Sequence, residues 1–152
     1  KVQCQPKTKL LQLHMKARME FASKYRFWCE EWHNVIFSDE KKFSLDGPDS
    51  CKRYWRNMRQ GRRSCFKGGF GGGSVMVWAA FCYRGKSSMC YISTRMNAQM
   101  YVDLLDSELI EFGGNLYGDD WTFQHDNASI HAAQVTKSFF TERKIPVLDR
   151  PA

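Results

Sequence analysis

Residues 74–83 read S-V-M-V-W-A-A-F-C-Y and are apolar at almost every position. A short run that is apolar on both faces is typical of a strand at the centre of a sheet. The Arg84-Gly85-Lys86 turn follows it, and residues 89–93 can return as another strand. The glycine-rich residues 68–73 precede it and lack the Gly-Lys-Ser/Thr of a phosphate-binding loop, so they predict a flexible connection. The stretch therefore predicts the middle of a β-sheet.

N-terminal to this stretch, a helix is expected from about residue 8 to residue 29. Its apolar stripe recurs at steps of three and four residues, at Leu10, Leu13, Ala17, Phe21, Tyr25 and Trp28. The apolar run at 35–37 and the alternation at 43–45 predict a strand or hairpin before an Asp-Gly-Pro turn. A further strand is expected near residues 53–56.

On the C-terminal side, helices and strands alternate. Asn97 can cap a helix that Gly113-Gly114 would end, and its expected inward face is Tyr101, Leu104, Leu105, Leu109 and Phe112. A short strand at 121–125, a helix with Val135, Phe139 and Phe140, and a strand at 145–148 follow. Strands that come first in a run and then alternate with helices predict an α/β fold, a mixed sheet with helices packed on its faces.

The composition fits one folded domain and excludes several other classes. The 152 residues are 43% hydrophobic and 14% aromatic, enough for a single packed core. No apolar run approaches the roughly 20 residues of a membrane span, and residues 1–11 lack the apolar centre of a signal peptide. The six cysteines contain no C-x-x-C pair, so free thiols of a reducing compartment are expected rather than a zinc site or a disulfide framework.

The charge of the chain is concentrated in one segment. The net charge is +7, yet residues 50–102 contain ten Lys and Arg and no Asp or Glu, which leaves −3 on the remainder. The densest part contains Lys52, Arg53, Arg56, Arg59, Arg62 and Arg63, with Tyr54 and Trp55 among them. Such a segment favours a DNA or RNA partner, because it neutralises phosphates and its rings can stack on bases. A basic face that only keeps the protein soluble is the alternative.

Two acids follow predicted strands and are candidate metal ligands. Asp39 comes directly after residues 35–38, and Asp126 directly after residues 121–125. Magnesium prefers oxygen ligands, and paired magnesium ions can clamp the attacking and leaving oxygens of a phosphodiester. Ordinary turn and cap roles are the alternative for both acids. Glu40 is expected to face away from Asp39 by strand alternation, and His125 and His131 flank Asp126 without a spacing that indicates covalent catalysis.

Four strings in succession resemble Tc/mariner-type transposases across nearly the whole chain. They are V-I-F-S-D-E-K-K-F at 35–43, G-G-S-V-M-V-W-A-A-F at 72–81, M-N-A-x-x-Y at 96–101 and F-Q-H-D-N-A-S-I-H-A-A at 123–133. The resemblance implies a ribonuclease-H-like fold and cut-and-paste DNA transposition that depends on Mg²⁺ or Mn²⁺. It makes Asp39 and Asp126 the first two carboxylates of a catalytic Asp, Asp, Asp-or-Glu triad. It also implies DNA partners in the form of transposon ends and target DNA, a possible homodimer and a nuclear location.

The same resemblance divides the chain. Residues 1–30 match a linking helix that would follow a DNA-binding region, and residues 31–152 match part of the catalytic domain. The family's third carboxylate lies thirty-odd residues past the second, whereas 26 residues follow Asp126 here. We therefore expect a partial transposase with little activity of its own. The alternative is a non-catalytic DNA-binding remnant or co-opted module.

Overall fold

The structure is a computed structural model that describes residues 11–44, 58–59 and 73–151. Its elements along the chain are helix α1 (Gln12–Tyr25), the 3₁₀-helix η1 (Glu30–Asn34), strands β1 (Val35–Ser44), β2 (Ser74–Cys82), β3 (Gly85–Lys86) and β4 (Cys90–Ile92), helix α2 (Ala98–Leu104), the π-helical turn η2 (Leu105–Leu109), helix α3 (Ile110–Tyr117), strand β5 (Thr122–Gln124) and helix α4 (Gln134–Glu142). Among the described residues, the helices and strands expected at 35–45, 74–83, 89–93, 97–114, 121–125 and 134–140 occur in this order, whereas the expected turn at 84–86 contains the short strand β3.

The described strands form one mixed sheet with β1 inside it. β1 pairs antiparallel with β2 and parallel with β5, and both β3 and β4 pair antiparallel with β2. A single parallel bridge from Phe123 to Val147 continues the sheet beyond β5, where the sequence predicted a full strand at 145–148. The mixed sheet predicted from the sequence is confirmed.

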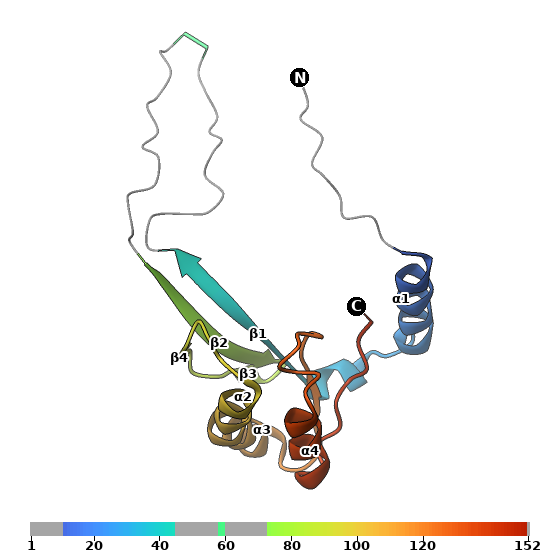
Figure 1. Cartoon of the computed structure of the whole chain (residues 1–152). Coiled ribbons are helices and arrows are strands. Elements are labelled where there is room, and N and C mark those ends of the chain that lie inside the picture. Colours follow the sequence, from blue (N-terminus) through green and yellow to red (C-terminus); the bar gives the residue numbers. More distant parts are fainter. Residues whose placement is uncertain (1–10, 45–57, 60–72, 152) are drawn as a thin grey trace.

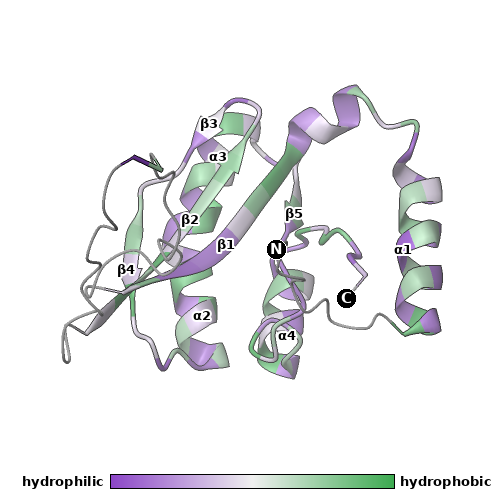
Figure 2. Ribbon diagram, turned by 90° about the horizontal axis from the view of Figure 1, so that it is seen from above, coloured by the Kyte–Doolittle hydropathy of each residue, from purple (hydrophilic) through white to green (hydrophobic). Residues whose placement is uncertain are grey.

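Helices α2, α3 and α4 cover one face of this sheet, whereas α1 stands apart beside it (Figures 1 and 2). Between the helices and the sheet lie fully buried side chains from both layers, with Trp78 from β2, Phe123 from β5, and Tyr101, Leu105 and Leu109 from the helices. Burial of this apolar area is the main favourable contribution to folding. The helical layer therefore determines which face of β1 is buried.

β1 differs from its prediction because it is one uninterrupted strand of ten residues. Its register with β2 runs without a break from Phe37, opposite Phe81, to Ser44, opposite Ser74. The polar residues 38–42 stay extended because their backbone groups bond to the apolar β2. Asp39 consequently lies within the strand and not at its end.

The helix capped by Asn97 also extends beyond its predicted end. The Asn97 side chain accepts a hydrogen bond from the Met100 N–H at 2.9 Å, as predicted. The helical segment then runs through Gly113 and Gly114 and ends at Tyr117, followed by Gly118 with φ +63°. Gly113 is buried, and a Cβ added to it would lie 2.5 Å from the ring of Trp121. That glycine serves close packing and not helix termination.

Three other helix predictions need correction. α1 ends at Tyr25, and of its described stripe only Tyr25 is buried, while Leu13 is 72% exposed. In α4, Phe139 and Phe140 are buried as predicted, but Val135 is exposed. The sequence predicts His131 in the first turn of the helix after Asp126, but it lies in a turn before α4, which begins at Gln134.

Several expectations fall on residues that the structure does not describe. These are the strand at 53–56, the glycine-rich connection up to residue 72, and the basic residues Lys52, Arg53, Arg56, Arg62 and Arg63. Arg59 is described and lies exposed in a turn. Cys29, Cys82 and Cys90 are free thiols. In the described ranges, none of the helices has the length and apolar character needed to cross a membrane.

Candidate functional site

The two predicted carboxylates stand at matching positions of neighbouring strands. β1 and β5 run parallel, with Phe37 opposite Gln124. Asp39 and Asp126 each come two residues after this pair in the sequence. Neighbouring strands of a sheet lie about 4.8 Å apart, so both acids come from the same end of the β1–β5 pair. Asp39 lies inside β1, and Asp126 lies just beyond the end of the adjacent strand β5.

Asp39 and its neighbour Glu40 point to opposite faces of β1. Asp39 is exposed, on the face that the helices leave open. Glu40 lies on the same face as the buried Ile36 and Ser38, and its side chain is only 10% exposed. The alternation expected between Asp39 and Glu40 is therefore confirmed.

The loop after β5 holds the carboxylate of Asp126. Its Oδ1 atom accepts a hydrogen bond from the Ala128 N–H at 2.9 Å and lies 2.7 Å from Nδ1 of His131. Partial burial would raise the pKa of Asp126, but the Ala128 N–H and His131 outweigh it and lower that pKa. Asp126 is consequently ionised at neutral pH, although its side chain stays 48% exposed.

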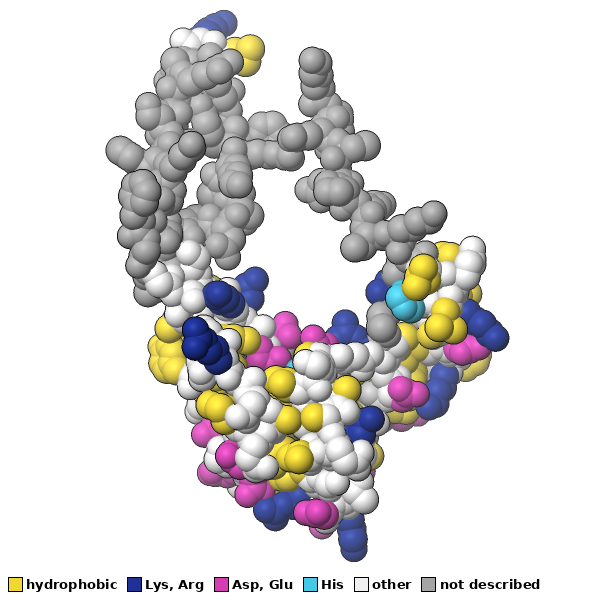
Figure 3. All heavy atoms as spheres, viewed as in Figure 1, with side chains coloured by type: hydrophobic (Ala, Val, Ile, Leu, Met, Phe, Trp, Pro, Cys, Tyr) yellow, Lys and Arg dark blue, Asp and Glu magenta, His cyan; other side chains and the backbone are white. Residues whose placement is uncertain are grey.

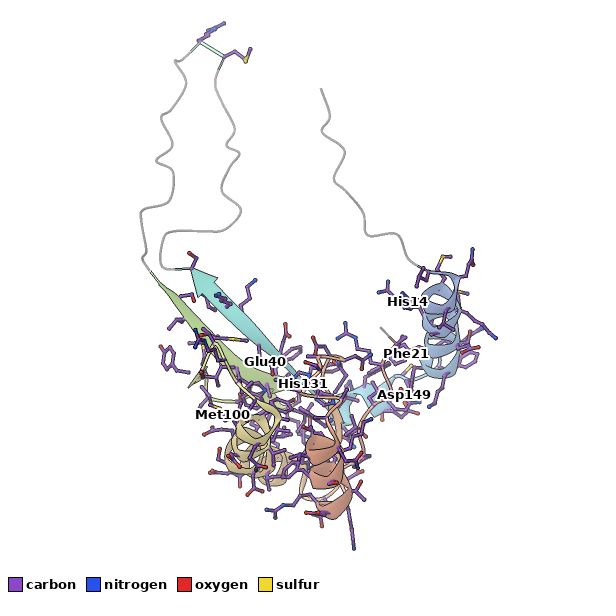
Figure 4. All side chains as sticks on the ribbon, viewed as in Figure 1. His14, Phe21, Glu40, Met100, His131 and Asp149 are labelled. Atoms are coloured by element: carbon purple, nitrogen blue, oxygen red, sulfur yellow. The ribbon has the colours of Figure 1, made fainter. Side chains whose placement is uncertain are left out.

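His131 lies between Asp126 and Glu40. Its Nε2 atom is 3.5 Å from Oε1 of Glu40, and its side chain is 1% exposed. Burial would lower the pKa of His131, but the carboxylates of Glu40 and Asp126 together raise it above the ordinary value. Figure 4 shows Glu40 on β1 beside His131 from the loop before α4. The structure thus joins Asp126 to Glu40 through an imidazole ring.

Two further rings hold this imidazole in place. His125 stacks on His131 with ring centroids 4.7 Å apart, and the Tyr101 ring lies 4.3 Å from His131. The Tyr101 hydroxyl is 3.0 Å from Nδ1 of His125. Burial raises the pKa of Tyr101, whereas burial and the neighbouring His131 lower the pKa of His125 to about 4. The phenol is therefore the donor and the neutral His125 the acceptor of this hydrogen bond.

The sequence places both histidines beside Asp126 but indicates no partner for either, and the contact of His131 with Glu40 is not predicted from it. The feature of the sequence that could have indicated this contact is the alternation of side chains between the two faces of β1. An ionisable side chain on the same face as Ile36 and Ser38 faces the core and needs a partner there. The identity of that partner follows only from the fold, because His131 comes from a distant loop.

A cavity of about 820 Å³ opens beside Asp126 and is lined also by Asn127, Lys137, Lys144 and Arg150. The Asn127 side chain donates a hydrogen bond to the Arg150 carbonyl at 2.8 Å, which ties the Asp126 loop to the C-terminal segment. Figure 3 shows acidic side chains together in the concave centre of the molecule, with Lys and Arg around them. The open side of Asp126 is therefore accessible from solvent.

The donor set of this region fits a hydrated magnesium ion. Among residues 11–44, 58–59 and 73–151, no three Asp, Glu, His or Cys side chains are gathered as a complete metal cluster. Mg²⁺ nevertheless needs only one or two protein carboxylates, since it keeps several waters. An exposed Asp39 and an ionised Asp126 that offers an oxygen to solvent are ligands of this kind.

Comparison with known proteins identifies relatives of the chain. It is 42% identical over 139 residues to the Tc3 transposase of Caenorhabditis elegans. The aligned region covers 91% of this chain and 42% of the Tc3 transposase. It is 32% identical over 143 residues to the Tcb1 transposase of Caenorhabditis briggsae, covering 90% of this chain and 52% of that protein. The chain therefore spans about half the length, or less, of these curated relatives. No protein-family model matches it.

Solved structures show the same fold. The Mos1 mariner paired-end complex with Mg superimposes with a TM-score of 0.80 at 21% identity, over the whole of this chain and 47% of that one. The Mos1 transposase catalytic domain superimposes with a TM-score of 0.64 at 16% identity, over 95% of this chain and 64% of that one. The sheet and helices thus have the ribonuclease-H-like architecture of a transposase catalytic domain. Over about 90% of its length the chain is thus similar in sequence to the Tc-type transposases, in agreement with the resemblance of its motifs.

Proposed function

We propose that this segment supplies Asp39 and Asp126 to a site that cuts DNA and transfers the cut strand with the help of Mg²⁺ or Mn²⁺. The observation that supports the proposal is the parallel register of Phe37 with Gln124, because Asp39 and Asp126 each follow this pair by two residues in the sequence. The Mos1 structures described with Mg and with Mn support this choice of ions. In the nucleus, DNA would be the substrate of the complete protein.

Each acid has a distinct part in this proposal. Asp126 is oriented by Ala128 and His131 and would present its free oxygen to a cation. Asp39 would approach the same cation from the exposed face of β1. A bound divalent cation would supply Lewis acidity for water activation and for the developing charge on phosphate oxygens. Cleavage also needs a third carboxylate, so we propose that these 152 residues alone cut DNA poorly or not at all.

DNA is the proposed partner of the basic segment. Residues 50–102 contain no acid, and their densest basic part includes Lys52, Arg53, Arg56, Arg59, Arg62 and Arg63. These side chains would neutralise phosphates of transposon ends or target DNA. The related Mos1 structures include a paired-end complex with the left transposon end, which supports transposon-end DNA as a partner, and we propose target DNA and a homodimer in addition.

The decisive experiment restores a third carboxylate. The chain is compared with a version extended at its C-terminus by a Tc3-type segment that carries this acid, and with Asp39→Asn and Asp126→Asn variants of the extended protein. Nicking of supercoiled plasmid is measured with Mg²⁺ or Mn²⁺, and only soluble, folded preparations are used. We expect nicking by the extended protein alone.

Three results would contradict this proposal. Equal nicking by the chain and its extended version would show that two carboxylates suffice. Unchanged nicking by the extended Asp126→Asn variant would remove Asp126 from the site. DNA binding by an extended protein that never nicks would favour the non-catalytic DNA-binding module.

A further inference from the structure

Glu40 is an ionisable residue on the buried face of the sheet, where its side chain is stable only with a partner. Its Oε1 atom is buried and has no hydrogen-bond partner among the described residues. The same is true of Nε2 of His131, which lies 3.5 Å from it. Two buried polar groups without other partners stabilise each other only if a proton lies between them, so the two side chains form a pair.

The other nitrogen of His131 faces Asp126. Nδ1 is 2.7 Å from Oδ1 of Asp126 and 3.1 Å from the backbone carbonyl oxygen of the same residue, and it must be the donor because both oxygens only accept. The Ala128 N–H bonds to Oδ1 at 2.9 Å. Both contacts of the carboxylate therefore use Oδ1 and not Oδ2, and the Asp126 side chain stays 48% exposed.

Aromatic packing restricts the His131 ring. His125 stacks on it at an interplanar angle of 14°, and Tyr101 packs against it at 30°. With 1% of its side chain exposed, the imidazole has little freedom to turn. Glu40, the imidazole and Asp126 thus form a rigid row from β1 to the loop after β5.

We propose that His131, held at Nε2 by Glu40, is a positioning residue that fixes the rotamer of the Asp126 carboxylate through Nδ1. The role of Asp126 as a metal ligand rests on the function proposed above, whereas the positioning itself concerns only the protein. Residues that hydrogen-bond to metal ligands commonly contribute 10–100-fold to metal affinity, about 1.4–2.7 kcal/mol.

Two substitutions separate the nitrogens of His131. In His131→Asn, the amide nitrogen is as many bonds from Cα as Nδ1 and can still donate to Asp126. In His131→Gln, the amide nitrogen matches Nε2 and can reach Glu40 only. Both variants lose the ring, and their side chains differ from each other by one methylene group only. His131→Ala removes both donors, Glu40→Ala removes the support, and His14→Asn on α1 is a remote control (Figure 4).

The first measurement needs no metal. Three-bond couplings between Hα and Hβ of Asp126, measured by NMR on the 152-residue chain, report whether one rotamer is populated. We expect one rotamer in the original protein, in His14→Asn and in His131→Asn. We expect averaging in His131→Gln and His131→Ala, and partial averaging in Glu40→Ala.

The second measurement is Mn²⁺ affinity, followed by the EPR signal of free Mn²⁺. We expect a 10–100-fold loss in His131→Gln and His131→Ala, while His131→Asn keeps most of the affinity. A general loss of structure would lower both amide variants equally, and thermal unfolding identifies such a loss.

The two measurements also separate the positioning from the proposed function. A fixed Asp126 rotamer in both His131→Gln and His131→Ala would overturn the positioning role, and a fixed rotamer in Glu40→Ala would overturn the part of Glu40. If the couplings behave as expected but the original chain binds no Mn²⁺, the positioning stands and the metal site fails.

Discussion

Phe37 on β1 is the parallel register partner of Gln124 on β5. Because Asp39 and Asp126 each follow this pair by two residues, the proposed metal site depends on a strand pairing between two distant segments. The site should therefore behave as one unit, with each acid depending on the other.

We expect Asp39→Asn and Asp126→Asn each to lower Mn²⁺ affinity about tenfold or more, roughly 1.4 kcal/mol. The double variant should lose clearly less than the sum, because the second substitution acts on a site already broken. EPR titration of the four proteins measures this coupling. Strictly additive losses would place the two acids at separate sites.

Binding of DNA should be sensitive to salt and nearly independent of its sequence. Replacement of Arg56, Arg59, Arg62 and Arg63 by Ala should flatten the logarithmic salt dependence by up to about 3–4 units if each contacts one phosphate. Fluorescence anisotropy with duplexes of two unrelated sequences measures the slope. Replacement of Lys16, Lys24, Arg26 and Arg143 removes the same charge and is the control. An unchanged slope in the first variant would show that these arginines do not contact phosphates, and it would favour a basic face that only keeps the protein soluble.

The adjacent glycines of α3 should respond in opposite directions to alanine. At Gly114 a new Cβ meets nothing within 4 Å, so Gly114→Ala should stabilise the protein by up to about 1 kcal/mol. At Gly113 the Cβ would lie 2.5 Å from Trp121, so Gly113→Ala should destabilise it by about 1–3 kcal/mol. Urea unfolding of both variants tests this pair. Equal effects would contradict the packing of α3 on Trp121.

Stability should fall as the pH drops from about 6.5 toward 4. The pKa of His125 is about 4 in the folded protein against 6.5 for a free histidine, because it is buried beside His131. The unfolded chain therefore binds more protons in this window, and about 3 kcal/mol of stability present above pH 6.5 is lost on acidification. His131, with a raised pKa, acts in the opposite sense and loses its contribution as the pH rises.

The variant His125→Asn isolates this contribution. Its amide oxygen can accept the Tyr101 hydroxyl in place of Nδ1, but it does not titrate. We expect lower stability at pH 7, from lost ring packing, together with a flatter pH dependence between 6.5 and 4. Urea unfolding at several pH values measures both. A pH dependence as steep as in the original protein would assign the effect to other groups.

Much of the fold could be predicted from local patterns. The central strand β2, the cap at Asn97 and the short strand before Asp126 follow from apolar runs and capping residues that act over a few positions. β1 was harder to predict, because residues 38–42 are polar and remain extended only through their pairing with β2. The end of α3 was misjudged at Gly113, since its contact with Trp121 comes from outside the helix.

The amino-acid sequence by itself determined the order of the elements, the concentration of positive charge in residues 50–102 and the two acids that follow apolar stretches. These properties depend on neighbouring residues and on composition, so they are present before the chain folds. Only the tertiary structure decided that Glu40 meets His131, that His131 meets Asp126 and that Asp39 remains exposed on the other face of β1. Each of these facts depends on which face the helices cover and on how β1 pairs with β5, because the partners come from separate segments that only folding brings together.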